Sequence, residues 1–219
     1  MLQYKKAPTS EAVVAHLVNI LTLQLNAGKR VLWLIPGGSA IEVAVQVGRQ
    51  LTGLSLENLY VTLTDERYGP VGHKDSNWQQ LTDKGLNLPG AHLLPVLSGA
   101  DIDQTTRAFA DTLSAQLAAA DYSLGLFGMG SDGHTAGILP GTVAVASTEL
   151  AEHYQAASYL RVTMTGAAIG QLDEAMLYAA GSEKQPALTM LDEPTDPAAQ
   201  PAQFLKQVPR LTVYTDVNI

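Results

Sequence analysis

The stretch from Leu124 to Thr142 has the residue types best suited to proton transfer. It begins as an apolar run and then changes to Gly128-Met-Gly-Ser-Asp-Gly-His134, which places one histidine and the carboxylate of Asp132 among small residues. An unperturbed imidazole titrates near pH 6.5, so it can accept or donate a proton at neutral pH. Because open α/β sheets bind ligands beyond the carboxyl ends of their strands, the pattern predicts that His134 is a general base or acid in such a crevice.

Three other apolar runs also end in residues that could bind an anion. Residues 31–35 are followed by Gly37, Gly38 and Ser39, residues 59–63 by Asp65-Glu66-Arg67, and residues 174–180 by Lys184. A glycine turn that leads into a helix presents free backbone N–H groups to an anion. Arg67 could bind a phosphate or carboxylate, and the adjacent acid could position a neighbouring group. A Walker A loop is excluded, because the Gly-Lys-Ser/Thr ending is missing.

The order of the expected elements indicates the fold. We expect strands at residues 31–35, 59–63, 122–127, 159–164, 174–180 and 211–215, and a weak edge strand at 93–96. Helices are expected at 10–27, 40–51, from 101 or 103 to 120, and 186–191. Alternating strands and helices predict a doubly wound, mainly parallel α/β sheet, Rossmann-like, with helices on both faces. We find no composition break, so residues 1–219 are expected to form one domain.

Parallel strands bring their carboxyl ends to one edge of the sheet, so the four motifs should meet in one crevice. Arg161 lies inside the run 159–164, and a charge there either faces solvent or reaches a bound anion. Two other readings are disfavoured. The run Gly128-Met-Gly-Ser-Asp-Gly133 matches the dinucleotide-binding pattern G-x-G-x-x-G, but Asp132 would bring negative charge toward the pyrophosphate. That pattern also needs an acidic residue about 20 positions later, at the end of a second strand. Glu149 and Glu152 are the acids near that distance, and they lie in a region with little strand character. Ser39 and Ser131 are outside any G-x-S-x-G elbow, which disfavours a serine nucleophile.

Composition excludes several classes of protein. The net charge of −8 argues against a nucleic-acid surface, although a few local cations suffice for a small phosphorylated molecule. The chain has no cysteine, and its five histidines show no metal-ligand spacing. We expect no cofactor and no metal. No signal-peptide core and no membrane-length apolar run is present, so a cytoplasmic protein is expected.

The motifs resemble those of the α/β type of 6-phosphogluconolactonase, a family related to glucosamine-6-phosphate deaminase. The resemblance rests on Gly-Gly-Ser at 37–39, Thr-Asp-Glu-Arg at 64–67, Asp-Ser-Asn at 75–77, Gly-Met-Gly-Ser-Asp-Gly-His-Thr-Ala at 128–136 and Gly-Ser-Glu-Lys at 181–184. It covers roughly residues 10–184. Ala40 departs from the family, which often has threonine there, and this removes one phosphate donor.

The resemblance implies hydrolysis of 6-phosphoglucono-1,5-lactone without a metal. His134 matches the proposed base of the family, and the phosphate-binding positions fall on the turn 37–39, Arg67 and Lys184. Arg161 lies in a strand motif similar to the family's Arg-hydrophobic-Thr and is a further expected phosphate ligand. Either Asp132 or Asp65 would orient the imidazole. Backbone amides of the turn at Gly128, Gly130 and Gly133 would stabilise the oxyanion.

Two alternatives stay open. Related deaminases have a sequence similar to Asn-Glu-Pro a few residues after their Asp-Gly-His motif, and the glutamate transfers a proton. In this chain Leu139 stands in place of that glutamate. In the motif where the deaminases usually have Asp-Glu-Tyr, Arg67 stands in place of the tyrosine. Both differences favour the lactonase over an isomerase or deaminase. A sugar-phosphate-binding regulatory module would keep the cations but would not need His134. The expected partner is a phosphorylated sugar lactone, and the chain is expected to be a monomer or small homo-oligomer.

Overall fold

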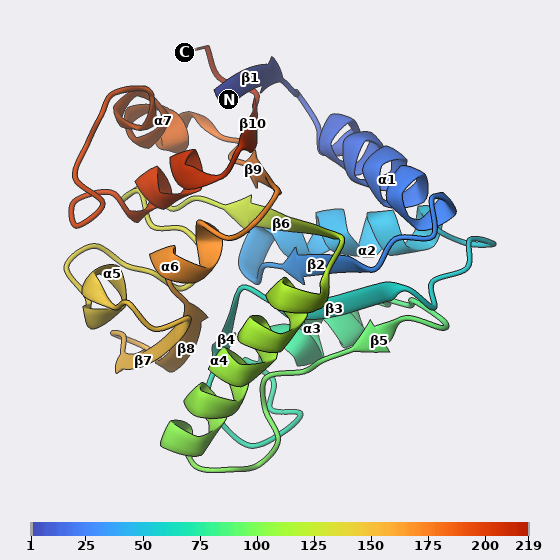
Figure 1. Ribbon diagram of the computed structural model, residues 1–219. Helices are drawn as coiled ribbons and strands as arrows, with labels where there is room; N and C mark the ends of the chain where they lie inside the picture. Colours follow the sequence, from blue (N-terminus) through green and yellow to red (C-terminus); the bar gives the residue numbers. More distant parts are fainter. Residues whose placement is uncertain (1, 219) are drawn as a thin grey trace.

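A seven-stranded parallel sheet forms the centre of the molecule (Figure 1). The computed structural model describes residues 2–218, and every neighbouring pair in this sheet is parallel. The fold class predicted from the sequence is therefore confirmed. In spatial order the strands are β1 (Leu2–Lys6), β10 (Arg210–Thr215), β9 (Glu174–Tyr178), β6 (Tyr122–Gly128), β2 (Val31–Ile35), β3 (Leu59–Leu63) and β5 (His92–Leu93).

Helices lie on both sides of this sheet. In Figure 1, α2 and α3 lie behind it and α4 lies in front. Helix α1 buries the stripe that its periodicity predicts, from Val13 to Leu25. The helices and 3-10 segments are α1 (Glu11–Asn26), η1 (Gly38–Ala40), α2 (Ile41–Gln50), α3 (Asn77–Asp83), α4 (Ile102–Ala119), α5 (Val143–Ala146), α6 (Gly166–Ile169), η2 (Ser182–Lys184), α7 (Gln185–Asp192) and η3 (Pro201–Gln207).

A second, antiparallel sheet adds a feature that the sequence did not predict. It has the strand order β4-β8-β7, formed by β4 (Asp65–Arg67), β8 (Leu160–Met164) and β7 (Ala151–Gln155). The expected strand at 159–164 therefore exists but lies outside the parallel sheet. The region of Glu152, judged poor in strand character, is a strand because pairing with β8 supplies the hydrogen bonds that its polar sequence does not suggest.

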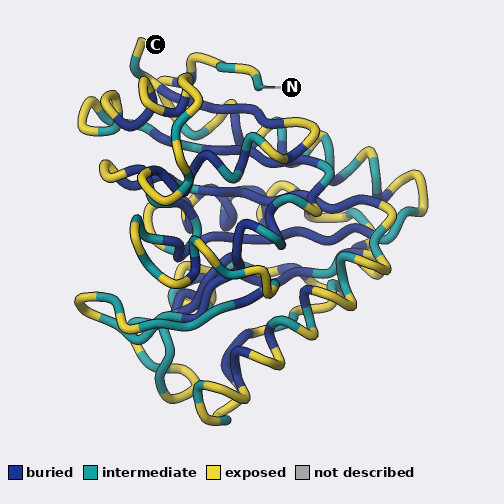
Figure 2. The backbone as a smooth tube through the Cα atoms, turned by 60° about the vertical axis from the view of Figure 1, so that its left-hand side comes forward, coloured by how far each residue is buried: buried dark blue, intermediate teal, exposed yellow. Residues whose placement is uncertain are grey.

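The core joins the strands of the parallel sheet to the helices on both of its faces. Figure 2 shows the central strands in the dark blue of buried residues and the outer turns largely in the yellow of exposed ones. Every residue of β2 is buried, from Val31 to Ile35. A strand covered on both faces needs a continuous apolar run rather than an alternating one, which is the pattern read from the sequence. No helix among residues 2–218 has the length and apolar character needed to cross a membrane. Met1 and Ile219, which the single-domain prediction includes, lie outside the described residues.

Candidate active site

The four polar motifs meet at one cavity of about 330 Å³ at the carboxyl edge of the parallel sheet. β2, β3, β6 and β9 are parallel neighbours, and the residues that follow them supply most of the lining. The sequence therefore correctly predicted which segments converge. The lining residues are Pro36, Gly37, Gly38, Ser39, Asp65, Arg67, Asn77, Gly128, Met129, Gly130, His134, Ala136, Arg161 and Lys184.

His134 forms a close pair with Asp132 at this cavity. The Nδ1 atom of His134 lies 2.6 Å from Oδ1 of Asp132, and the backbone N–H of His134 donates to the same oxygen at 3.1 Å. Because a carboxylate only accepts, Nδ1 carries the proton of the pair and Nε2 of a neutral ring is left with a free lone pair. Partial burial alone would raise the pKa of Asp132, but these contacts from His134 hold that pKa below its usual value.

The turn that presents His134 is held by hydrogen bonds within itself. The N–H of Gly130 donates to the carbonyl of His134, and the N–H of Gly133 donates to the carbonyl of Gly130. The N–H groups of Gly130 and Gly133 are thus used within the turn, and stabilisation of an oxyanion by the turn at Gly128, Gly130 and Gly133 stays a prediction. Gly130 has another function: a Cβ there would lie 2.1 Å from Nδ1 of His134, so only glycine lets the ring pack this closely.

The turn after β2 offers backbone N–H groups to the cavity. Gly38 has φ +66°, a conformation that glycine adopts without strain, and it begins η1, which runs directly into α2. No side chain caps η1 or α2. The first N–H groups of these segments therefore lack a side-chain acceptor, and the helix dipole of α2 adds positive potential.

Three cations line the same cavity from three different elements. Arg67 comes from β4, Arg161 from β8 and Lys184 from η2, and the first two are partners in the antiparallel register. Arg161 pairs with Asp65 at 3.2 Å, whereas no carboxylate among residues 2–218 forms an ion pair with Arg67 or Lys184. The cavity is thus locally cationic in a chain of net charge −8.

Asp65 holds Arg161 rather than the imidazole. Its Oδ2 accepts from Nη1 of Arg161, and its Oδ1 accepts from the hydroxyl of Thr64 at 3.2 Å. Of the two carboxylates that the sequence left open, only Asp132 contacts His134. Arg161 lies at the cavity, and Asp65 neutralises part of its charge.

Sequence reasoning missed four residues of the lining: Pro36, Asn77, Met129 and Ala136. Asn77 entered the sequence analysis only through the Asp-Ser-Asn motif and had no predicted role, yet its Nδ2 donates to the carbonyl of Asp65 and its side chain occupies the space where a Cβ of residue 37 would lie. Its position in the Asp-Ser-Asn motif was the available signal. Ala136 has φ +49°, an unusual conformation for a non-glycine residue.

The remaining polar clusters do not compete with this site. Within residues 2–218 there is no group of three or more potential metal ligands from His, Cys, Asp or Glu. A larger cavity of about 650 Å³ includes His16, Tyr122, Glu174 and Arg210, at the opposite ends of the strands. There Glu174 already bonds to Tyr122, Arg210 and His16, so its charge is satisfied within the protein.

The fold and the cavity together define a parallel α/β protein with a polar cavity at the carboxyl edge of its sheet. The model of the family described as glucosamine-6-phosphate isomerases/6-phosphogluconolactonase matches residues 5–213, and the chain belongs to this family. The resemblance inferred from the motifs is therefore confirmed.

Individual relatives agree with this assignment. A 6-phosphogluconolactonase of Synechocystis sp. is 31% identical in an alignment of 164 residues, and the match covers 70% of this chain and 68% of the relative. A 6-phosphogluconolactonase of Mycobacterium tuberculosis is 26% identical over 216 residues, which cover 89% and 87% of the two chains.

Solved structures share the fold at lower identity. The crystal structure of a 6-phosphogluconolactonase from Shewanella baltica matches this chain with a TM-score of 0.83 at 20% identity. The match covers 98% of this chain and 97% of the Shewanella chain. A monomeric glucosamine-6-phosphate deaminase reaches 0.82 at 19% identity, over 97% and 96% of the chains. The fold alone therefore does not distinguish the two activities, and the residues of the cavity must do so.

Proposed function

We propose that this protein hydrolyses 6-phosphoglucono-1,5-lactone to 6-phosphogluconate, the lactonase step of the pentose phosphate pathway. The observation that carries the proposal is the meeting of the Asp132–His134 pair with uncompensated cations and an uncapped turn around one cavity. The names of the curated relatives support the same reaction.

The substrate phosphate docks on the turn at Gly37, Gly38 and Ser39, between Arg67 and Lys184. Backbone N–H groups and cations are the donors that a phosphate dianion requires. Binding energy from this non-reacting end orients the lactone ring toward His134. Arg161 adds positive potential, although Asp65 takes up part of it.

His134 supplies the proton transfers. Its Nε2 accepts a proton from water as the water oxygen attacks C1 of the lactone, and the carbonyl oxygen becomes an oxyanion. The tetrahedral intermediate then expels the ring oxygen, which takes the proton back from Nε2. Asp132 holds the Nδ1–H tautomer and stabilises the imidazolium that forms between the two steps.

The residues favour hydrolysis over the deaminase reaction of the same family. Leu139 cannot transfer a proton, and it stands where the deaminase motif has glutamate. Arg67 stands where that motif has tyrosine. A regulatory module would not require the close Asp132–His134 contact, so catalysis explains more of the cavity than binding alone does.

The test is hydrolysis of freshly generated 6-phosphogluconolactone, with spontaneous ring opening subtracted, by the wild type and His134→Ala. We expect the variant to lose about 100-fold or more in kcat. Equal turnover by both proteins would remove His134 from the mechanism. No turnover by either, with 6-phosphogluconate still bound, would favour the regulatory module.

A further inference from the structure

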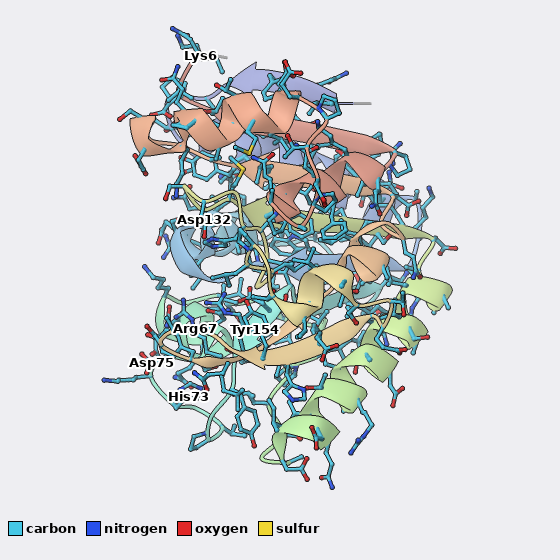
Figure 3. The ribbon with its side chains drawn as sticks, turned by 90° about the vertical axis from the view of Figure 1, so that its left-hand side faces the viewer. Lys6, Arg67, His73, Asp75, Asp132 and Tyr154 are labelled. Atoms are coloured by element: carbon cyan, nitrogen blue, oxygen red, sulfur yellow. The ribbon has the colours of Figure 1, made fainter. Side chains whose placement is uncertain are left out.

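The loop of residues 69–76, between β4 and α3, is closely bonded to Arg67. In Figure 3, the labelled residues Arg67, His73 and Asp75 lie in the same part of the molecule. The backbone N–H of His73 donates to the carbonyl of Pro70 at 3.1 Å, and the carbonyl of His73 accepts from the N–H of Ser76 at 3.0 Å. His73 therefore stands at the centre of the loop's own hydrogen bonds.

The guanidinium of Arg67 depends on this loop for its orientation. Its Nη1 donates to the backbone carbonyl of Asp75 at 3.2 Å, and the guanidinium carbon lies 5.0 Å from the ring centre of Tyr159. Its Nε is buried without a hydrogen-bond partner, and no carboxylate of residues 2–218 pairs with it. An arginine side chain has many rotamers, so the carbonyl of Asp75 is the main polar contact that selects one.

His73 fixes the loop against the strand that bears Arg67. Its Nε2 lies 2.9 Å from the backbone carbonyl oxygen of Arg67, and because a carbonyl only accepts, Nε2 must carry a proton. The ring also packs on Gly69, where a Cβ would lie 3.0 Å from it. One side chain thus links the backbone of Arg67 to the loop whose carbonyl holds the guanidinium.

We infer that His73 is a positioning residue for substrate phosphate: it acts through Arg67 and does not itself touch the substrate. The inference rests on the proposed function, in which Arg67 binds the phosphate. It follows that loss of the hydrogen bond from His73 weakens recognition of the phosphate and leaves the chemistry at the lactone carbonyl unchanged.

The experiment compares His73→Phe, His73→Gln and wild type on 6-phosphogluconolactone and on unphosphorylated glucono-1,5-lactone. Phenylalanine keeps a ring over Gly69 but has no donor, whereas glutamine keeps an N–H donor. For His73→Phe we expect KM for the phosphorylated lactone to rise about fivefold, with kcat within about twofold, and kcat/KM for glucono-1,5-lactone unchanged. In His73→Gln, KM for the phosphorylated lactone should be close to the wild-type value.

Val71→Ala is the matched control, since Val71 lies in the same loop with its side chain 63% exposed. It should behave as wild type on both lactones. Equal losses on the two lactones, a normal KM in His73→Phe, or no rescue by glutamine would overturn the inference. Arg67→Ala separates the two proposals: if it does not affect the phosphorylated lactone selectively, the proposed phosphate site fails and the inference fails with it. If it does, and His73→Phe does not, only the inference fails.

The inference can also be tested on the unmutated protein, which avoids the risk that a variant does not fold. Long-range ¹H–¹⁵N NMR spectra of the imidazole rings report which nitrogen is protonated. The geometry requires a proton on Nε2 of His73, and a neutral ring with its proton on Nδ1 would overturn the inference.

Discussion

At His134, a single contact decides which ring nitrogen is available for chemistry. The 2.6 Å approach of Asp132 assigns the proton to Nδ1, and the glycine at 130 makes room for that approach. The sequence predicted the histidine and two candidate carboxylates, because residue types and spacing are visible in it. It did not predict that Asp65 is occupied by Arg161, because that ion pair joins residues 96 positions apart.

Asp132→Asn tests this pair through the pH dependence of the reaction. The pKa of Asp132 is lowered, so its carboxylate stays ionised as the pH falls through the weakly acidic range and continues to stabilise the imidazolium. Removal of the negative charge should shift the acid limb of the kcat/KM profile to lower pH. It should also reduce kcat by about 10- to 100-fold. The measurement is initial rates from pH 5 to 8, and a variant with an unchanged acid limb would refute the role of Asp132. Ser131→Ala, next to it in the same turn, is the control.

At the scale of elements, prediction succeeded for strands whose own sequence favours the strand conformation. β2 and β3 were predicted to the residue. β2 is a continuous apolar run, as a strand buried on both faces requires, and β3 (LYVTL) consists mainly of apolar, β-branched and aromatic residues that favour strands. β1, β4 and β7 were missed, since their sequences are polar and partner strands stabilise them. β4 shows the reason most clearly, because the side chain of Glu66 is fully buried within it.

Glu66 joins β4 to the start of α3. Its carboxylate accepts from the backbone N–H groups of Arg67, Asn77 and Trp78 at 2.6 to 3.1 Å, and from the hydroxyl of Ser76 at 2.8 Å. Burial raises the pKa of Glu66, although these four hydrogen bonds favour its ionised form. The negative charge at a helix N-terminus is also favourable to α3.

Glu66→Ala should therefore destabilise the protein by about 2–4 kcal/mol, since it leaves buried donors without an acceptor. Urea unfolding followed by circular dichroism measures the loss. Because β4 also bears Arg67, KM for the phosphorylated lactone should rise as well. Glu57→Ala, at an exposed position, should change stability by less than about 0.5 kcal/mol. If Glu66→Ala unfolds at the same urea concentration as Glu57→Ala, the anchoring role is wrong.

At the scale of the whole molecule, the two ends of the parallel sheet bear different polar clusters. The carboxyl edge has the cationic cavity, and the amino edge has Glu174 at the first position of β9, only 4% exposed. β9 has five residues, so the two clusters are separated by about 15 Å of strand. This separation places the Glu174 cluster far from the proposed phosphate site at the other end of the sheet.

Glu174→Ala tests that division. Its carboxylate accepts from the hydroxyl of Tyr122, pairs with Nε of Arg210 at 3.2 Å and lies 3.5 Å from Nε2 of His16. Removal of this carboxylate should cost about 1–2 kcal/mol in the free energy of unfolding, because the buried hydroxyl of Tyr122 loses its acceptor, whereas the side chain of Arg210 is 57% exposed. The kcat and KM for the lactone should stay within about twofold of wild type. Asp111→Ala, on the exposed side of α4, should change neither quantity.

The pH dependence of that loss gives the test a second readout. Burial lowers the pKa of His16, Lys5 lowers it further, and Glu174 opposes the shift. A folded-state pKa below the unfolded value of about 6.5 means that the unfolded chain binds a proton first, so stability falls as the pH drops below about 6.5. Without Glu174 the folded-state pKa falls further, so Glu174→Ala should lose more stability than wild type between pH 7 and 5. A lowered kcat in Glu174→Ala would show that the two ends of the sheet do not act separately. If the stability of the variant does not fall more steeply with acid than that of wild type, the interaction between Glu174 and His16 is refuted.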